Sequence, residues 1–384
     1  MVRVLHVSTS GDIAGGAEHS LLELLTREKS LGVDPTVLVP HSGSLVSELD
    51  RLGVPVIRIR YFSWLEWVRQ STLRRYAVRF IKGACNIVAE YRIKRVLGRA
   101  AIDVLHINTS ATAAGAMSAR KLNVPVVWHV REFNSPASGR VFAHPRQQMG
   151  RIAGAEVVIA VSKVAAAPYL QYRRGETVKV IYDAVEPPTR VRDIGDLLSS
   201  EPYRLAVVGS VMPSKGQLDA LRALKLVRDN SGHRPVLSLV GPFVDPAYEK
   251  EIKSFVRDAE LSDQVRFAGK VADVYAELLL ADVLIVSSRS ESFGRATVEG
   301  MLAGCLVVGA KNTGTEELLM NGRGFLYEQG SMGLAQQLIA AFTDVERAKA
   351  TAAKGQSFGT RMSNQMRSTR EFVAAVEEAR NGQR

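Results

Sequence analysis

The sequence predicts an α/β protein made of two doubly wound, Rossmann-like parallel-sheet domains, and three observations lead to this prediction. Apolar runs with strand composition alternate with helix-compatible stretches along both halves of the chain. The 384 residues, 46% of them hydrophobic, are enough to bury two cores. A polar, proline-bearing segment at 186–202 separates the halves. Strands that alternate with helices form a parallel sheet with helices on both faces.

The first half supplies the strands of one sheet. Its start, residues 2–8, is an apolar run followed by a helical stretch at 17–31. Further elements are a helix expected at 45–52 and strands expected at 36–40, 54–59, 102–107, 124–130 and 156–161. This pattern fits a parallel sheet of about seven strands.

The second half repeats the alternation. Its strands are expected at 204–209, 236–240, 265–269, 283–286, 306–309 and 325–327. We therefore expect an N-terminal domain over 1–185, a linker over 186–202, a second domain over 203–365, and a helix over 366–384 that can pack back on the first domain. Ligands of doubly wound sheets bind beyond the carboxyl ends of the strands, which in two such domains would face a shared cleft.

Composition narrows the class of protein. No apolar run approaches the length of a membrane-spanning helix, and the first residues look like a strand rather than a cleavable signal, which predicts a cytoplasmic protein. Cys85 and Cys305 are the only cysteines, so we expect reduced thiols and no disulfide framework, and neither cysteine has a metal-ligand or nucleophile neighbourhood. The net charge of +11 gives information about binding partners and solubility rather than about the fold.

The stretch from Glu291 to Glu299, ESFGRATVE, is the most informative motif. It places two carboxylates around Phe293 and Gly294, where a strand passes into a helix. The first turn of a helix offers N–H groups and a partial positive charge to a phosphate, and a glycine allows close approach. Glu299 is placed to accept hydrogen bonds from a ribose diol, and Glu291 from sugar hydroxyls. Taken alone, such a pair would more often be solvated surface charge.

Three further strand-to-helix turns carry a similar signal. Gly15 and Gly16 permit the close backbone approach of an anion-binding turn, although the dinucleotide spacing G-x-G-x-x-G is absent and an ordinary tight turn is equally compatible. Lys215, in the loop 209–216, is either a point charge that reaches a diphosphate or a solvated lysine. The turn at 313–316, TGTE, can offer N–H groups or hydroxyls.

His129 lies near the carboxyl end of an expected first-domain strand, where it would face the cleft. A histidine at such a position is otherwise often a satisfied core residue. Arg131 and Glu132 follow it, and they either pair with each other or leave Arg131 to contact a phosphate.

The combination of these motifs resembles the retaining glycosyltransferases of family 4, which have the GT-B fold. The resemblance spans nearly the whole chain, and its most specific part is the Glu291 to Glu299 turn with the GCLVV and GTEE sequences that follow. It implies two Rossmann-like domains facing a cleft, a UDP- or GDP-linked sugar donor held mainly by the second, and an acceptor held mainly by the first. It implies no obligatory metal and no cofactor beyond the donor.

The resemblance also implies individual roles. Lys215 would bind the donor diphosphate, Glu299 the ribose and Glu291 the donor sugar, and His129 would lie beside the reacting centre. The donor site carried over in this way comprises Gly16, Ser210, Lys215, Phe293, Gly294, Arg295 and Glu299, with His129 and Glu291 as the catalytic positions.

The chain departs from the family pattern at three places. Ser210 stands where family members often have Arg, so the amides beside Gly294 would carry more of the diphosphate. Asp183 stands in a Tyr-Asp-Ala sequence where Asn-Gly is common, and Val130 follows the histidine where Asp is common. We expect the acceptor hydroxyl to attack from the leaving-group side, with Glu132 left open as an alternative nucleophile.

The segment from Tyr61 to Ala100 concentrates the positive charge. It holds two acids and nine basic residues, namely Arg69, Arg74, Arg75, Arg79, Lys82, Arg92, Lys94, Arg95 and Arg99. With Trp64 and Trp67, the cations Arg74, Arg75 and Arg79 have the composition of an interfacial helix that would bring the enzyme to the cytoplasmic face of an anionic inner membrane and to a lipid-linked acceptor. The alternative is a surface helix whose aromatic residues enter the core.

The leading hypothesis is therefore a metal-independent hexosyltransferase that builds a surface polysaccharide or lipopolysaccharide. A sugar-nucleotide 2-epimerase of the same fold is the alternative enzyme. A basic nucleic-acid-binding protein is the non-enzymatic alternative, but no recognised nucleic-acid module is present, so no nucleic-acid partner is expected.

Overall fold

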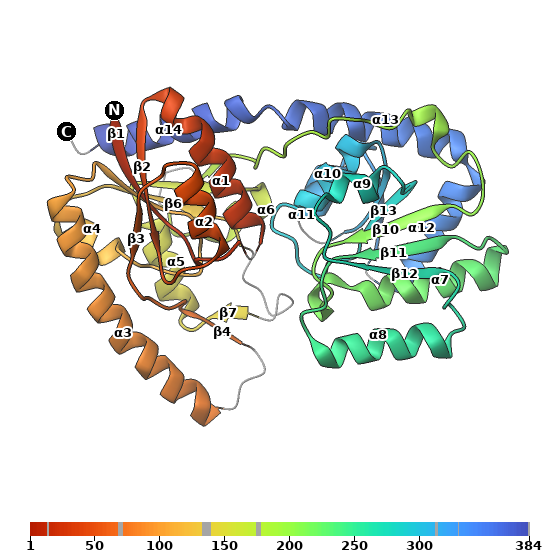
Figure 1. Cartoon of the computed structure of the whole chain (residues 1–384), viewed down its shortest axis with the longest axis horizontal. Helices are drawn as coiled ribbons and strands as arrows, with labels where there is room; N and C mark the ends of the chain where they lie inside the picture. Colours follow the sequence, from red (N-terminus) through yellow and green to blue (C-terminus); the bar gives the residue numbers. More distant parts are fainter. Residues whose placement is uncertain are drawn as a thin grey trace. The chain divides into compact units, whose positions relative to one another are not determined.

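The chain divides into two compact units (Figure 1). The structure is a computed structural model that describes residues 1–13, 15–67, 72–132, 140–173, 178–311, 314–328 and 330–382. Unit 1 comprises Met1–Ala184 together with Gln365–Arg384, and unit 2 comprises Val185–Asn364. Each unit contains its own parallel sheet.

Unit 1 is built on a seven-stranded parallel sheet with the order β3-β2-β1-β5-β6-β8-β9. Its strands are β1 (Val2–Val7), β2 (Val33–Val39), β3 (Val56–Arg58), β5 (Val104–Ile107), β6 (Val126–Val130), β8 (Val157–Ala160) and β9 (Lys179–Val180). Its helices are α1 (Gly16–Glu28), the short 3-10 helix η1 (Lys29–Leu31), α2 (Ser44–Arg51), α3 (Thr72–Arg99), α4 (Ala116–Lys121), α5 (Pro145–Ala153), α6 (Lys163–Leu170) and α14 (Gln365–Asn381).

The central strands of this sheet are buried on both faces, as parallel strands usually are. Every residue of β5, β6 and β8 is buried. On one face, Leu24 of α1 and Phe372 and Val376 of α14 share a hydrophobic cluster with Val4 and Val127. The last helix of the chain is therefore part of the core of the first unit (Figure 1).

Unit 2 is built on a six-stranded parallel sheet with the order β12-β11-β10-β13-β14-β15. Its strands are β10 (Arg204–Val208), β11 (Val236–Val240), β12 (Val265–Gly269), β13 (Val283–Val286), β14 (Leu306–Ala310) and β15 (Phe325–Tyr327). Its helices are η3 (Ile194–Asp196), η4 (Pro213–Lys215), α7 (Gln217–Ser231), α8 (Pro246–Asp258), α9 (Val274–Leu278), α10 (Arg295–Ala303), α11 (Gly314–Leu319), α12 (Ser331–Thr343) and α13 (Val345–Met362).

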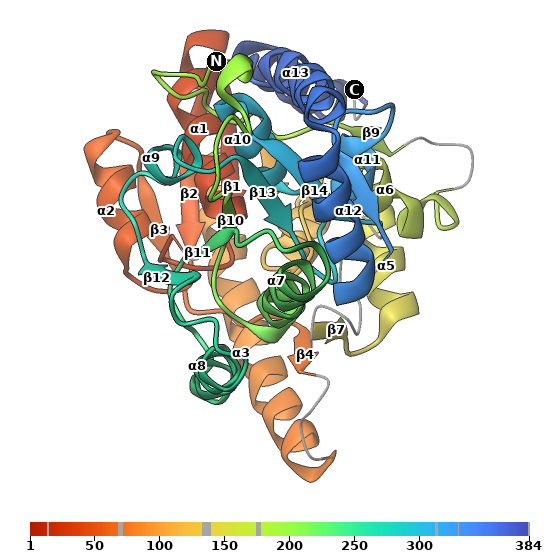
Figure 2. The ribbon, with the colours of Figure 1, turned by 90° about the vertical axis from the view of Figure 1, so that its right-hand side faces the viewer.

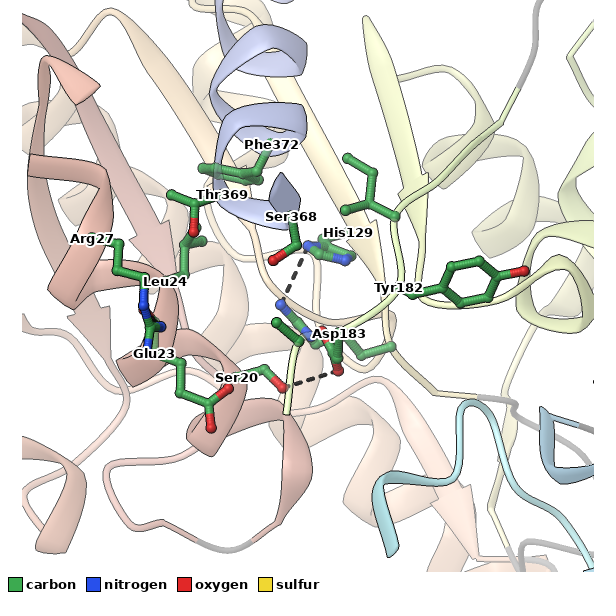
Figure 3. A pocket seen from close by; sticks show the side chains of 13 residues that line it. Ser20, Glu23, Leu24, Arg27, His129, Tyr182, Asp183, Ser368, Thr369 and Phe372 are labelled. Carbon is green, nitrogen blue, oxygen red and sulfur yellow. Dashed lines mark hydrogen bonds and ion pairs between the residues drawn. The ribbon is translucent and has the colours of Figure 1, made fainter. Parts of the chain in front are cut away.

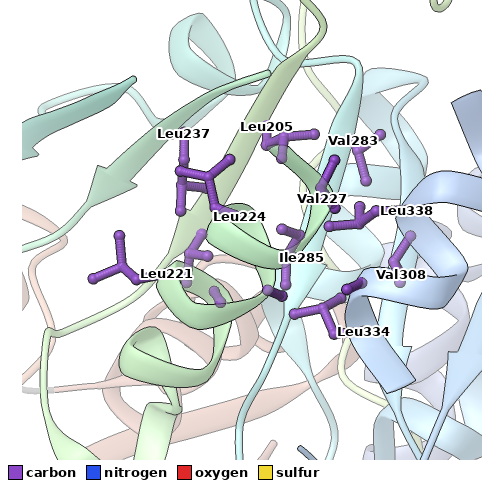
Figure 4. Packing of buried hydrophobic residues seen from close by; sticks show 14 of the residues in the cluster. Leu205, Leu221, Leu224, Val227, Leu237, Val283, Ile285, Val308, Leu334 and Leu338 are labelled. Carbon is purple, nitrogen blue, oxygen red and sulfur yellow. The ribbon is translucent and has the colours of Figure 1, made fainter. Parts of the chain in front are cut away.

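Alternate residues of these strands point to one face, where α7 and α12 cover them (Figure 4). Leu205 and Ile285 of the sheet meet Leu224 of α7 and Leu334 of α12 in one cluster. Each of the four side chains is at most 1% exposed. This packed layer fixes the carboxyl ends of the strands, where the loops begin.

The structure assigns residues 186–202, expected to be a linker, to unit 2. Leu197 and Leu198 are buried in its core. The guanidinium of Arg192 lies 2.5 Å from the carboxylate of Asp282, and both side chains are largely buried. The segment is therefore anchored by apolar and ionic contacts instead of connecting the units as a free chain.

The helix expected over the aromatic and basic segment is wrong at its start. Leu65–Trp67 forms a short strand, β4, that pairs in antiparallel fashion with β7 (Arg140–Phe142). The helix α3 begins only at Thr72. None of the helices in the described part of the chain is long and apolar enough to cross a membrane.

Candidate functional site

Three loops of unit 2 come together at the carboxyl ends of neighbouring strands. They follow β10, β13 and β14, which are adjacent in the order β10-β13-β14. The hydroxyl of Ser287 donates to the carbonyl of Lys215 at 2.9 Å, and the N–H of Gly314 donates to the carbonyl of Glu291 at 2.8 Å. These bonds join the three loops into one surface at the edge where doubly wound sheets bind ligands.

Two glycines make this close approach possible. Gly216 has a φ of 70°, and a Cβ at this position would lie 2.1 Å from the carbonyl oxygen of Ser287. Gly294 has a φ of 90° and directly precedes α10. Both residues have a φ in the left-handed region that favours glycine. The backbone conformation of the two loops therefore requires glycine at these positions.

Lys215 and Glu291, which are far apart in sequence, form an ion pair in this surface. The ammonium of Lys215 donates to Oε2 of Glu291 at 2.8 Å. The two side chains remain 32% and 19% exposed, so a ligand can reach both. Both residues were expected to contribute to one site, and in unit 2 they are in direct contact.

Two buried hydroxyls flank Gly294. A Cβ at this glycine would lie 3.0 Å from Oγ1 of Thr297 and 3.3 Å from Oγ1 of Thr315. Both hydroxyl oxygens are buried and have no hydrogen-bond partner among the described residues. A buried polar group without a partner costs free energy, which water or a ligand oxygen would offset. Sequence reasoning did not single out Thr297, although it lies inside the motif.

The other expected donor residues of unit 2 lie in or beside this surface. Arg295 and Glu299 occupy the first two turns of α10, with Nε of Arg295 3.6 Å from Oε1 of Glu299. Phe293 is buried, and the carbonyl of Ser210 accepts a hydrogen bond from Gln217 at 3.0 Å. Of the predicted 313–316 turn, residue 313 lies outside the described part of the chain.

Unit 1 has a second polar cluster at the carboxyl ends of β5 and β6. The carboxylate of Glu132 accepts hydrogen bonds from the hydroxyl of Thr109 at 2.6 Å and from the N–H and hydroxyl of Ser110 at 2.7 and 2.8 Å. The sequence analysis did not predict Thr109 and Ser110 as site residues. The polar run of 108–110 directly after a buried strand is the pattern that could have indicated them.

Arg131 pairs with Asp183 and not with Glu132. Its guanidinium donates to the carboxylate of Asp183 and to the side-chain carbonyl of Asn108, both at 2.5 Å. Ser20 of α1 donates to the same Asp183 at 2.9 Å. Arg131 is only 8% exposed and is held in place by Asn108, which follows β5, and by Asp183, which follows β9.

Gly16 begins α1, and Glu18 lies in the first turn of this helix. The carboxylate of Glu18 is 4% exposed and accepts a hydrogen bond from the hydroxyl of Thr9 at 2.8 Å. Burial raises the pKa of Glu18 above its ordinary value, the Thr9 hydrogen bond opposes this shift, and the nearby Glu132 charge adds to it. A buried carboxyl with a raised pKa next to a second carboxylate is an arrangement typical of functional sites.

His129, near the carboxyl end of β6, is buried inside unit 1. It lines a small pocket of about 40 Å³ between α1, the segment after β9 and α14 (Figure 3). Its ring is only 3% exposed because Phe372 of α14 stacks over it and His106 lies on another side. Burial lowers the pKa of His129, and the Arg131 charge adds to this effect. The imidazole is therefore neutral at pH 7.

The expected acceptor or membrane residues separate into two groups. Trp64 packs onto Trp128 with ring planes 8° apart and donates from Nε1 to the carbonyl of Ser110 at 2.7 Å, which is the core arrangement. Arg79 forms a bidentate ion pair with Glu66 at 2.7 and 2.9 Å. The side chains of Trp67, Arg74 and Arg75 lie outside the described part of the structure.

A hollow of about 190 Å³ lies between α3 and the segment around β4 and α5. Trp64, Lys82 and His144 are among the residues that line it. An aromatic ring, a cation and an imidazole therefore surround one space in this hollow. Among the described residues, no group of three or more His, Cys, Asp or Glu side chains could hold a metal ion.

Two family models match the chain, one in each half. The model described as glycosyl transferase 4-like domain matches residues 15–183. The model described as glycosyl transferases group 1 matches residues 193–358. Together they cover most of both units.

Individual proteins agree with these matches. MJ1178 of Methanocaldococcus jannaschii, described as an uncharacterized glycosyltransferase, is 25% identical over 298 residues, which are 73% of this chain and 78% of that protein. N-acetyl-alpha-D-glucosaminyl L-malate synthase of Bacillus anthracis is 33% identical over 97 residues, 25% of this chain and 26% of that protein.

A solved structure shows that the fold is shared over the full length. Alr3699/HepE of Anabaena, crystallised with UDP and glucose, superposes with a TM-score of 0.78 at 22% identity, over 98% of this chain and 100% of that chain. These findings confirm the glycosyltransferase prediction and the GT-B fold over the nucleic-acid alternative. The chain therefore belongs to the glycosyl transferases group 1, the retaining GT-B glycosyltransferases of family 4.

Proposed function

We propose that this chain transfers a hexose from a UDP-linked donor to a lipid-linked glycan acceptor during the synthesis of a surface polysaccharide. The donor class is supported by the Anabaena neighbour, whose structures contain UDP, UDP with glucose, and UDP-glucose. The acceptor class is inferred from the basic, aromatic segment of unit 1.

The observation that carries the proposal is the pair of unsatisfied hydroxyls at the start of α10. Thr297 and Thr315 flank Gly294, and the ion pair of Lys215 with Glu291 lies in the same joined loops. A diphosphate supplies oxygens that accept from both hydroxyls, from the helix start and from the ammonium. A donor sugar supplies hydroxyls that donate to Glu291.

The chemistry follows from this arrangement. When the bond between the anomeric carbon and the diphosphate breaks, negative charge develops on the leaving oxygen, and the N-terminus of α10 and Lys215 stabilise it. The acceptor hydroxyl attacks from the same side, forms the new bond to the anomeric carbon and gives its proton to the departing phosphate. The configuration is retained, and no covalent enzyme intermediate is required.

Ser210 affects how the diphosphate is held. In place of the arginine common in the family there is a hydroxyl, so one cation is missing from the loop that carries Lys215. We propose that the N–H groups at the start of α10 and the threonine hydroxyls make the diphosphate contacts that this arginine would otherwise make. The ribose is assigned to Glu299, which lies one turn further along α10.

A thermal-shift panel tests the donor. UDP should raise the unfolding temperature more than GDP, ADP or UMP, because binding to the native state alone shifts unfolding by mass action. UDP-glucose, UDP-galactose and their N-acetyl derivatives then define the sugar. If GDP stabilises the protein and UDP does not, the donor assignment is wrong; if no nucleoside diphosphate has an effect, the donor site itself is wrong. Release of an epimerised nucleotide sugar without acceptor would favour the 2-epimerase.

A further inference from the structure

Helix α3 of unit 1 carries an apolar stripe on its outer side. Phe80, Ile87 and Tyr91 are 80%, 68% and 60% exposed, and Ile81 and Val88 beside them are 60% and 54% exposed. Spacings of three, four and seven residues place these side chains on one face of the helix, over about 16 Å of its length. Figures 1 and 2 both show α3 on the outside of unit 1, with its first turns extending past the sheet.

This concentration is unusual for the molecule. The described part of the chain has fifteen large hydrophobic residues with high exposure, and five of them lie within these twelve residues of α3. The others are scattered, which is normal for a protein surface, whereas a continuous exposed stripe indicates an interaction site. The opposite face of the same helix is ordinary core, since Ala89, Ile93 and Leu97 are at most 2% exposed.

The exposed charges in the last two turns of α3 are all positive. Arg92, Lys94, Arg95 and Arg99 are exposed in the last two turns, and the guanidinium of Arg95 lies 5.0 Å from the ring centre of Tyr91. The helix has a single acid, Glu90. Its carboxylate points inward, where it accepts hydrogen bonds from the N–H groups of Gly115 and Ser118 at 2.8 and 3.0 Å. The outer face is therefore apolar and cationic.

We propose that the outer face of α3 binds the interfacial region of an anionic lipid bilayer. The stripe of Phe80, Ile81, Ile87, Val88 and Tyr91 enters the boundary between head groups and acyl chains, and the basic residues of the last turns contact lipid phosphates. This inference deepens the proposed function. It rests on that proposal in one respect, namely that the acceptor is lipid-linked. It also changes the interface expected from the sequence, because Trp64 and Arg79 are engaged inside unit 1.

A bilayer fits this surface better than a protein does. The stripe lies on one convex helix, whereas peptides bind in grooves. A second copy of α3 would bring two sets of cations together, and the one acid of each helix, Glu90, points inward and does not compensate them. An anionic membrane supplies both a place for the apolar side chains and the opposite charge. Because α3 does not qualify as a membrane-spanning helix, the attachment is interfacial.

Vesicle flotation of the full chain tests the proposal. The protein should float with vesicles of phosphatidylglycerol and phosphatidylcholine, bind pure phosphatidylcholine vesicles much more weakly, and lose binding as salt increases. Lys94→Glu/Arg95→Glu should weaken binding by about 30-fold or more, because each basic residue near an anionic surface contributes about one kcal/mol. The control Lys250→Glu/Lys270→Glu makes the same charge change on exposed lysines of unit 2 and should bind like the original protein.

The apolar stripe needs its own variants. Phe80→Ser/Ile87→Ser should weaken vesicle binding by at least about tenfold, since the transfer of two large apolar side chains is lost. Leu170→Ser/Leu280→Ser removes side chains of 51% and 56% exposure elsewhere and should have no effect. In Phe80→Trp, lipids brominated on the acyl chain should quench the added fluorescence, whereas the tryptophan of Leu170→Trp should not be quenched.

Three results would overturn the proposal. One is the absence of binding to vesicles rich in phosphatidylglycerol at about 100 mM salt, a concentration that leaves short-range attraction intact. Another is equal binding by the α3 variants and their controls. The third is a change from dimer to monomer in Phe80→Ser/Ile87→Ser, measured by light scattering, with vesicle binding unchanged, which would assign the stripe to a second copy. The UDP thermal shift is measured without lipid, so failure of the donor assignment is seen separately.

Discussion

Replacing Lys215 tests the donor site most directly. Its ammonium lies 2.8 Å from the carboxylate of Glu291. In Lys215→Ala that carboxylate remains beside the start of α10, so a neutral pair becomes a net negative charge where a diphosphate must bind. A hydrogen bond between charged groups contributes about 1.5–3 kcal/mol. The affinity for UDP should therefore fall about 10- to 150-fold.

The double variant separates the lost attraction from the added repulsion. A carboxylate about 6 Å from a phosphate, at an effective dielectric constant of about 20, costs up to about 3 kcal/mol before screening by salt. Lys215→Ala/Glu291→Ala should consequently recover roughly tenfold of the lost UDP affinity. Glu291→Gln alone should bind UDP at least as tightly as the original protein, but it should transfer sugar more slowly because a sugar contact is weakened.

Titration calorimetry with UDP measures these affinities, and thermal unfolding checks the fold. A partly exposed ion pair contributes about 1 kcal/mol or less to stability, so the unfolding temperature should change little. Lys253→Ala is the control, because Lys253 forms an ion pair with Glu249 at 2.6 Å on the surface of the same unit. Equal UDP affinity in Lys215→Ala and in the double variant would refute the electrostatic coupling, and normal affinity in both would refute the site.

Three further predictions concern other parts of the two units. Glu299→Ala should reduce transfer by orders of magnitude and abolish the preference for UDP over 2′-deoxy-UDP in binding assays; a retained preference would place the ribose elsewhere. Gly294→Ala should destabilise unit 2 by about 1–3 kcal/mol in urea unfolding, because its φ of 90° is unfavourable for alanine and its Cβ would lie 3.0 Å from the Thr297 hydroxyl; an unchanged midpoint would argue against that loop conformation. Burial lowers the pKa values of His106 and His129, with further lowering by nearby His and Arg charges, so the unfolded chain binds more protons than the folded one below about pH 6.5. The contribution of these histidines to the free energy of unfolding is therefore fully present above that pH and is lost as the pH falls, by up to about 1.4 kcal/mol per pH unit for each histidine. In the His106→Gln/His129→Gln variant, the free energy of unfolding should depend less steeply on pH between pH 7.5 and 5.5. Equal slopes in the variant and the original protein would contradict the lowered histidine pKa values.

Most strands could be predicted because buried parallel strands are continuous apolar runs. The run at 283–286 and the strand β13 coincide, and the run at 102–107 contains β5. β9 was missed, since Lys179–Val180 has two residues and no apolar run of its own. β4 was missed because its pairing partner, Phe142 opposite Leu65, is distant in the sequence. Local composition does not record such long-range pairing.

The site was predictable to the extent that turn chemistry is local. The glycines at 216 and 294 mark the positions where the backbone needs a positive φ, and this need is visible in the sequence. The contact between Lys215 and Glu291 could be suggested only through the family resemblance. The cover over His129 could not be foreseen, because Phe372 comes from the other end of the chain. The burial of Glu18 was hidden for the same reason, since a glutamate in a glycine-rich loop looks exposed.

The position of α14 has a consequence for how this protein is made. Phe372 and Val376 complete the core of unit 1, yet they are synthesised after the whole of unit 2. Unit 2 is one continuous segment, so it can finish folding on the ribosome while unit 1 still waits for its last helix. The usual order, in which the N-terminal domain folds first, is thereby reversed for the final step. Until α14 arrives, the core of unit 1 is incomplete, and its exposed apolar surface is prone to aggregate or to bind chaperones.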